Sequence, residues 1–171
     1  DAAGLTGLTL VSLDDVAPFE EAPETCAIFE ENALAKARDA FTASGLPSVA
    51  DDSGLEVAAL NGMPGVLSAR WSGNHGDDAA NTALLLAQLR DVPDERRGAA
   101  FVSACALVSA SGEVVVRGEW PGSITRKPRG DGGFGYDPVF VANGYDRTAA
   151  ELSPAEKDAV SHRGRADRKS V

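Results

Sequence analysis

The stretch AAFVSACALVSASGEVVVRGEW, residues 99–120, carries the clearest fold signal in the chain. Residues 99–110 place apolar and small side chains alternately on both faces, which is typical of a strand that is buried on both sides. Ser111 and Gly112 then favour a turn, and the consecutive valines in residues 113–120 favour a second strand. The sequence therefore predicts an antiparallel hairpin whose first strand is buried.

Helical signals precede this hairpin. Residues 29–44 have apolar side chains at helical spacing among good helix formers, and Gly45 supplies a stop. A second helix is expected to begin at the capping acids 77–78, to include Leu89 and to be closed by Pro93. Helices and strands thus share one chain, which predicts an α/β protein.

Two adjacent acids lie between the predicted helices. Ser48–Ala50 predicts a short strand, and Asp51, Asp52, Ser53 and Gly54 are expected to end it in a turn. Because consecutive residues of an extended chain face opposite ways, only one of the two carboxylates can address a given site. Such a carboxylate can hold Mg²⁺ or deprotonate a water, but paired aspartates before Ser-Gly are also common turn chemistry. The pattern alone leaves both interpretations open.

The glycine-rich stretch from Pro121 to Pro138 is expected to be a long ordered loop. Residues 130–135 match the letters GxGxxG, but Pro138 opposes the helix that a dinucleotide-binding turn requires. What remains is a loop that carries Phe134 and Tyr136 beside Asp137. Exposed aromatic rings there would suit stacking against a base, and the alternative is a tight turn with core aromatics.

Cationic residues follow near the end of the chain. The capping box at residues 153–156 places Lys157 in the first turns of a helix, and His162 and Arg163 come shortly after it. A cationic set in an acidic protein indicates an anionic or carbonyl-bearing ligand. A solvated helix terminus is the alternative.

Composition excludes several classes of protein. The 16 basic and 26 acidic side chains give a formal charge of −10, which opposes binding to nucleic acid or to an anionic membrane surface. With 43% hydrophobic residues and a length of 171, the chain is expected to form a single domain over residues 1–171. Cys26 and Cys105 are too few for a disulfide framework and lack the spacing of a zinc site. No apolar run is long enough to span a membrane, so we expect a cytoplasmic protein.

Short blocks of sequence occur in a fixed order from about residue 24 to residue 165. They are FEENA (29–33) with KA (36–37), ADDSGL (50–55), PGV (64–66) with SAR (68–70), GGFGYDP (132–138), AAEL (149–152), EK (156–157) and SHRG (161–164). Together they resemble the inosine/xanthosine triphosphate pyrophosphatase family, the HAM1-like purine nucleoside triphosphatases.

The resemblance implies an α/β fold with an elongated mixed sheet flanked by helices, and two lobes around a central substrate cleft. It further implies a homodimer that uses Mg²⁺ to hydrolyse deaminated purine triphosphates (ITP, dITP and XTP) to the monophosphate and pyrophosphate. Two alternatives are a non-catalytic nucleotide-binding remnant and a pyrophosphatase of modified pyrimidine nucleotides. Magnesium-dependent pyrophosphate release and a nucleotide panel would separate them.

The resemblance also implies residue roles. Asp52 would be the general base and a metal ligand, with Glu24 as a second candidate metal ligand. Lys157, His162 and Arg163 would donate to a 6-keto oxygen, which would favour such purines over adenine. The resemblance implies that Lys36 meets the phosphates and that Ser53 touches the substrate. It also implies a base pocket lined by Phe134, Gly135, Tyr136 and Asp137 and completed by Lys157, His162 and Arg163.

The chain departs from the family pattern in three places. Pro23, Cys26 and Ile28 stand in the segment around Glu24, where the family has other residues. The family's N-terminal Ser/Thr-x-Asn-x-x-Lys phosphate loop is absent, and a short polar tail follows Gly164 in place of an apolar helix. We therefore expect the domain to be incomplete at both ends, and a version extended by an N-terminal strand and loop to be more active and more soluble.

Overall fold

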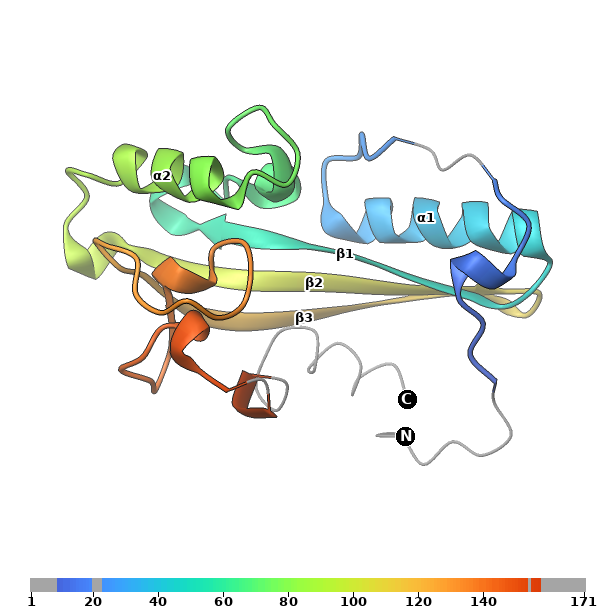
Figure 1. The fold of residues 1–171 in the computed structure, drawn as a ribbon. Helices are drawn as coiled ribbons and strands as arrows, with labels where there is room; N and C mark the ends of the chain where they lie inside the picture. The colour runs from blue at the N-terminus through green and yellow to red at the C-terminus, as the bar shows by residue number, and fades with distance from the viewer. Residues whose placement is uncertain (1–8, 20–22, 154, 158–171) are drawn as a thin grey trace.

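The computed structural model describes residues 9–19, 23–153 and 155–157. Its sheet has four strands in the order β1-β2-β3-β4, and every described pair is antiparallel. The three long strands give the molecule an elongated shape (Figure 1). The strands are β1 (Ser48–Val57), β2 (Gly98–Ser109), β3 (Gly112–Ile124) and β4 (Phe140–Ala142), and the helices are α1 (Phe29–Ser44) and α2 (Asp78–Gln88). The predicted α/β class is confirmed, and the described part of the sheet contains no parallel pair.

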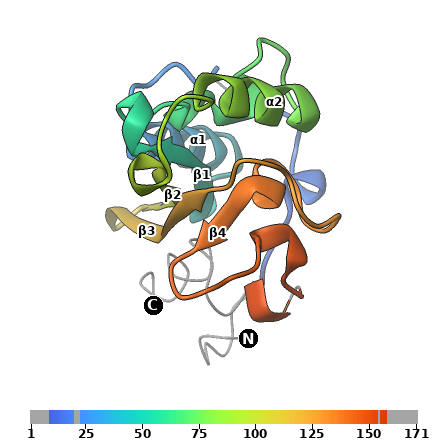
Figure 2. The ribbon, with the colours of Figure 1, turned by 90° about the vertical axis from the view of Figure 1, so that its left-hand side faces the viewer.

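Two hydrophobic cores lie along the long strands. α1 covers one half of the strands, and α2 together with the segment that contains β4 gathers around the other half (Figures 1 and 2). The first core joins Phe29, Ala33 and Ala37 of α1 to small residues of β2. Members of the second core include Leu55, Leu85, Leu89, Phe101, Trp120, Tyr136 and Phe140. These two cores agree with the expectation of two lobes, and a central substrate cleft stays a prediction.

The local signals of the helices are confirmed. α1 ends at Gly45, whose φ of 70° is the left-handed conformation that favours glycine. α2 is capped by Asp77, whose Oδ1 accepts a hydrogen bond from the Ala80 N–H at 3.0 Å. In the predicted capping box, the Ser153 N–H donates to Glu156 Oε2 at 2.8 Å.

The expected end of the first strand is wrong. β1 does not turn at residues 51–54 but continues to Val57, with Asp52 opposite Ala104 of β2. The turn chemistry of Asp-Asp-Ser-Gly is local, and the ten-residue ladder with β2 outweighs it. The paired acids therefore lie within a strand, on its two opposite faces.

The predicted hairpin is confirmed, but its second strand is longer than expected. β3 runs through Pro121 to Ile124, so the long loop begins after the strand rather than at the proline. The Asn143 N–H donates to the carbonyl oxygen of Pro121 at 2.9 Å, and the first residue of β3 that pairs with β4 is Gly122. The proline nitrogen thus lies just beyond the end of the β4 ladder, where no donor is needed.

No helix in the described ranges is both long enough and apolar enough to cross a membrane.

Candidate active site

Asp52 lies where β1 passes beneath α1. Its side chain is 10% exposed and faces the helix, whereas Asp51 is exposed on the opposite face of the strand. Asn32 and Lys36 lie one turn apart on α1, so both can reach the strand. Asn32 Nδ2 donates to Asp52 Oδ2 at 2.9 Å, and Lys36 Nζ lies 3.3 Å from Asp52 Oδ1 and 3.2 Å from the Asp51 carbonyl oxygen.

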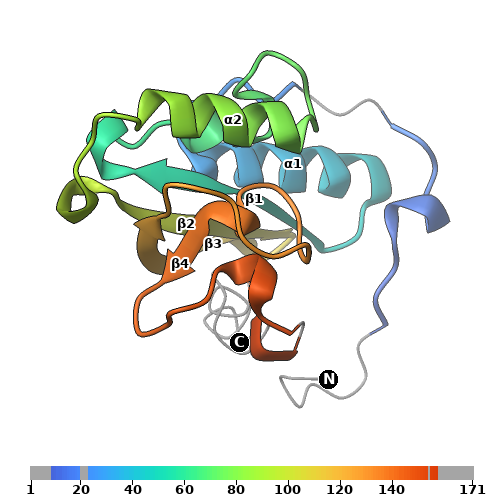
Figure 3. The ribbon, with the colours of Figure 1, turned by 60° about the vertical axis from the view of Figure 1, so that its left-hand side comes forward.

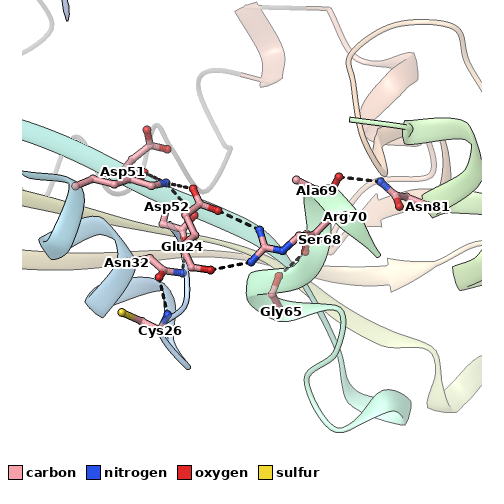
Figure 4. A network of polar contacts seen from close by, with 11 residues as sticks. Glu24, Cys26, Asn32, Asp51, Asp52, Gly65, Ser68, Ala69, Arg70 and Asn81 are labelled. Atoms are coloured by element: carbon pink, nitrogen blue, oxygen red, sulfur yellow. Dashed lines mark hydrogen bonds and ion pairs between the residues drawn. The ribbon is translucent and has the colours of Figure 1, made fainter. Parts of the chain in front are cut away.

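A second carboxylate joins Asp52 from the segment before α1. Glu24 Oε1 lies 2.5 Å from Lys36 Nζ, and Glu24 Oε2 lies 3.3 Å from the Arg70 guanidinium, which also donates to the Glu24 carbonyl oxygen. Figure 4 shows Glu24, Asn32 and Asp52 gathered together, with Arg70 reaching them from a neighbouring turn. We call Glu24, Asn32, Lys36, Asp52 and Arg70 the carboxylate cluster.

Burial and neighbouring charges shift the pKa values of the ionisable groups in the cluster. Burial raises the pKa of Asp52, and Glu24 acts in the same direction, while Asn32 and Lys36 oppose the shift. Burial acts to raise the pKa of Glu24, but Lys36 and Arg70 outweigh it and lower that pKa. Burial acts to lower the pKa of Lys36, but Glu24 and Asp52 outweigh it and raise that pKa. A charged lysine thus stands beside a buried aspartate that accepts a proton more readily than an exposed one.

The residues of the cluster fit a divalent cation that is shared with substrate. Oxygens of Asp52 and Glu24 converge on the Lys36 ammonium group, so their arrangement already surrounds a positive charge. Mg²⁺ is commonly held by one or two carboxylates together with substrate phosphates. Within the described part of the chain, no group of three or more His, Cys, Asp or Glu residues could hold a metal ion alone. The donor set is therefore open rather than a closed protein cage.

The glycine-rich loop brings together three of the predicted substrate-binding residues. Phe134 is 60% exposed, and its N–H donates to Oδ2 of the buried Asp137 at 2.8 Å. Lys157 Nζ lies 2.5 Å from the same oxygen and 4.5 Å from the centroid of the Phe134 ring. Phe134, Asp137 and Lys157 thus form one unit, which we call the aromatic loop site.

Of the two interpretations left open for the aromatic pair, the core interpretation holds for Tyr136. This residue is 4% exposed and belongs to the second hydrophobic core, and its hydroxyl donates to the Ser68 carbonyl oxygen at 2.8 Å. Burial raises the pKa of Tyr136 far above its ordinary value, so the hydroxyl stays a donor. Only Phe134 of the pair presents its ring at the surface.

A 3₁₀ turn, Gly65–Arg70, connects the two sites. Its last residue, Arg70, contacts the carboxylate cluster, and Ser68 of the same turn accepts from Tyr136 next to the aromatic loop site. The turn closes tightly on β1, because a Cβ at Gly54 would lie 2.5 Å from Ser68 Oγ. Only glycine permits this approach.

The remaining predicted residues are placed differently. Ser53 is partly buried and follows Asp52 in the strand, so its side chain faces away from the carboxylate cluster, towards the other face of the sheet. Contact of Ser53 with substrate therefore stays a prediction. His162 and Arg163 lie outside the described residues.

Comparison with known proteins places this chain in a family. A family model described as the Ham1 family matches residues 2–171. The chain belongs to the Ham1 family. The resemblance inferred from the short sequence blocks is thereby confirmed at the level of the family.

Individual Ham1 relatives are similar over nearly the whole chain. A protein from Mycolicibacterium paratuberculosis named dITP/XTP pyrophosphatase is 89% identical over 167 residues, which cover 97% of this chain and 82% of the relative. A protein of the same name from Mycobacterium tuberculosis H37Rv is 84% identical over 166 residues, covering 97% and 81%. A crystal structure from Mycobacterium abscessus titled nucleoside-triphosphatase / dITP/XTP pyrophosphatase matches with a TM-score of 0.87 and 69% identity, covering 99% of this chain and 87% of that one.

Sequence reasoning on this Ham1 chain missed Asn32 and Arg70. Asn32 did leave a signal, because it is a polar residue on the apolar stripe that Phe29, Ala33 and Ala37 bury against the sheet. Arg70 left none beyond its place in a quoted block, since its contact with Glu24 spans 46 residues. A buried polar residue on a core-facing stripe is thus the one local clue that the sequence offered.

Gly133→Ala is expected to disable the aromatic loop site. Gly133 has a φ of 73°, and a Cβ there would overlap Asp137 Oδ2, the oxygen that holds Phe134 and Lys157. Losing these bonds should raise the KM for nucleotide about tenfold or more. Steady-state kinetics measure this change. Gly144→Ala is the matched control, because Gly144 has a φ of 86° with nothing near its Cβ position. An equal KM effect in both variants would show that backbone strain alone is responsible.

Proposed function

We propose that this protein hydrolyses deaminated purine nucleoside triphosphates (ITP, dITP and XTP) to the monophosphate and pyrophosphate, and so clears them from the nucleotide pool. The observation that carries the proposal is the carboxylate cluster, in which the buried Asp52 and the partly buried Glu24 contact the cations of Lys36 and Arg70. The names of relatives that are 84% to 89% identical support the substrate class.

In the proposed reaction, Asp52 accepts a proton from a water that attacks the α-phosphorus. The new bond joins the water oxygen to the α-phosphorus, and the bond from that phosphorus to the α–β bridging oxygen breaks, so pyrophosphate leaves. The burial that raises the pKa of Asp52 makes its carboxylate a better proton acceptor. Lys36 and Arg70 attract the phosphate oxygens and offset the charge that develops on them.

We propose Mg²⁺ as the cofactor, with Asp52 and Glu24 as its protein ligands. When bound, the ion neutralises phosphate oxygens and polarises the phosphorus that is attacked. The protein's own contribution is to hold the two carboxylates close together and to keep Glu24 ionised, because the cations Lys36 and Arg70 lower the pKa of Glu24.

The base is assigned to the aromatic loop site. The exposed ring of Phe134 offers a face for stacking, and the ammonium group of Lys157 offers a donor beside it. A 6-keto oxygen accepts hydrogen bonds from such donors. The 6-amino group of adenine is itself a donor, so it would leave the donors of the protein without an acceptor. Together with His162 and Arg163 this should favour ITP over ATP by about 10² to 10⁴ in kcat/KM.

The direct test measures pyrophosphate release from ITP, XTP, dITP, ATP, GTP and a set of modified pyrimidine triphosphates, each with Mg²⁺ and with EDTA. We expect release from the first three nucleotides, and its loss when EDTA removes the metal. Equal kcat/KM for ATP and ITP would contradict the assignment of the base. Binding of ITP without any release would favour the non-catalytic remnant, and preference for pyrimidines would favour the other alternative.

We also propose a cytoplasmic homodimer, as the family resemblance implies. Cys26 and Cys105 are free thiols, which suits a reducing compartment. The net charge of −10 repels nucleic acid and anionic membranes, so neither is proposed as a partner. Light scattering that gives the mass of one chain would contradict the dimer.

A further inference from the structure

The loop that carries Phe134 is rich in glycine, so its own residues do little to fix its backbone conformation. Gly130, Gly133 and Gly135 have φ values of 81°, 73° and 59°, a conformation that glycine adopts with little preference over others. A backbone with this freedom populates many arrangements unless groups outside the loop restrain it. The position of the Phe134 ring therefore depends on the contacts that restrain the neighbouring peptides.

Two of these contacts come from α2, far away in the sequence. Asp78 Oδ2 accepts a hydrogen bond from the Gly135 N–H at 2.6 Å across 57 residues. One turn further along the helix, Thr82 Oγ1 lies 3.4 Å from the Gly135 carbonyl oxygen. α2 thus restrains both polar groups of the residue that follows Phe134. Figure 3 shows α2 and the orange segment that contains this loop close together.

The neighbouring acid has a different partner. Asp77 caps α2 by accepting from the Ala80 N–H at 3.0 Å, whereas the side chain of Asp78 leaves the helix and contacts the loop. The negative charges of Asp77 and Asp78 both interact favourably with the helix dipole at the N-terminus of α2. The helix dipole therefore explains an acid at position 78, but it does not explain why the Asp78 side chain contacts Gly135.

We propose that Asp78 is a positioning residue that sets where Phe134 presents its ring and thereby controls discrimination between purine bases. This inference rests on the proposed function, because it assigns the aromatic loop site to the base. The Gly135 nitrogen is joined directly to the carbonyl carbon of Phe134, so displacement of Gly135 moves Phe134. Stacking and donor contacts to a base tolerate little displacement. Lys157 remains bound to Asp137, so the ring and the ammonium group would lose their alignment.

The test compares Asp78→Ala with Asp77→Ala, which removes the same charge one residue earlier. Asp78→Ala is expected to raise the KM for ITP and to lower the ITP-to-ATP preference, each about tenfold, with kcat within about threefold. Asp77→Ala should lower the melting temperature through loss of the cap and leave the preference unchanged. Asp78→Asn keeps an acceptor oxygen and should restore most of the preference.

A second variant and a second measurement keep the test decisive. Thr82→Val removes the hydroxyl with little change of shape and should shift the preference in the same direction by less. Calorimetric binding of ITP and ATP reports the preference without turnover. If the unaltered protein binds ITP preferentially but releases no pyrophosphate, the proposed function fails while Asp78 can still be tested. Equal effects of Asp78→Ala and Asp77→Ala, or a loss of kcat at unchanged preference, would overturn the role of Asp78.

Discussion

Asp52→Asn is expected to lower kcat for ITP by about 10² to 10⁴ while the protein remains folded. An amide cannot accept the proton of the attacking water, and its NH₂ group would face a donor, either Asn32 Nδ2 or Lys36 Nζ. The fold should tolerate the change because burial raises the pKa of Asp52, which means that the folded state disfavours its charged form. Steady-state pyrophosphate release measures the loss, and thermal melting checks the fold.

Asp51→Asn is the matched control for this prediction. The two acids are adjacent in β1, but the side chain of Asp51 is exposed on the opposite face of the strand, and Lys36 donates a hydrogen bond to the backbone carbonyl oxygen of Asp51. Its kcat should stay within about threefold of that of the unaltered protein. Near-normal turnover in Asp52→Asn would remove Asp52 from the role of general base.

Arg97→Met is expected to lower the free energy of unfolding by about 3 kcal/mol or more. Arg97 is 2% exposed, and its guanidinium group donates to the carbonyl oxygens of Leu89, Ile124 and Thr125 at 2.6, 2.8 and 2.8 Å. It thereby joins the end of α2 to the end of β3. Methionine has a similar length but no donor, so buried carbonyl groups lose their partner. Urea denaturation measures the change.

Arg96→Met separates this effect from loss of charge. Arg96 precedes Arg97 in the chain but is exposed, so its replacement should change the free energy of unfolding by no more than about 0.5 kcal/mol. Burial lowers the pKa of Arg97, so relief of this buried charge offsets part of the cost. Similar stability in the two variants would show that the carbonyl groups find other partners.

Local sequence signals correctly predicted helix ends, caps and turns, because residues that are close in the sequence determine these features. The helix ending at Gly45, the cap at Asp77 and the hairpin turn at Gly112 depend on residues within one or two turns of each other. The same reasoning was wrong about the end of β1 and left the burial of Tyr136 open, because partners that are distant in the sequence decide both. β1 passes through Asp51 and Asp52 because β2 pairs with it. Tyr136 is buried in a core that is built mostly from distant parts of the chain, where its hydroxyl donates to the Ser68 carbonyl oxygen across 68 residues.

The sequence by itself determined the α/β class, the main helices and strands, the opposite orientation of Asp51 and Asp52, and the family that its blocks resemble. Only the tertiary structure decided which of these two acids faces α1 and which residues join it. Glu24, Asp52 and Arg70 meet although they are far apart in the chain, and Asp78 restrains Gly135 across 57 residues. The physical reason is that periodicity and capping report contacts within a few residues, whereas a site forms where the packing of helices on a sheet brings distant side chains together.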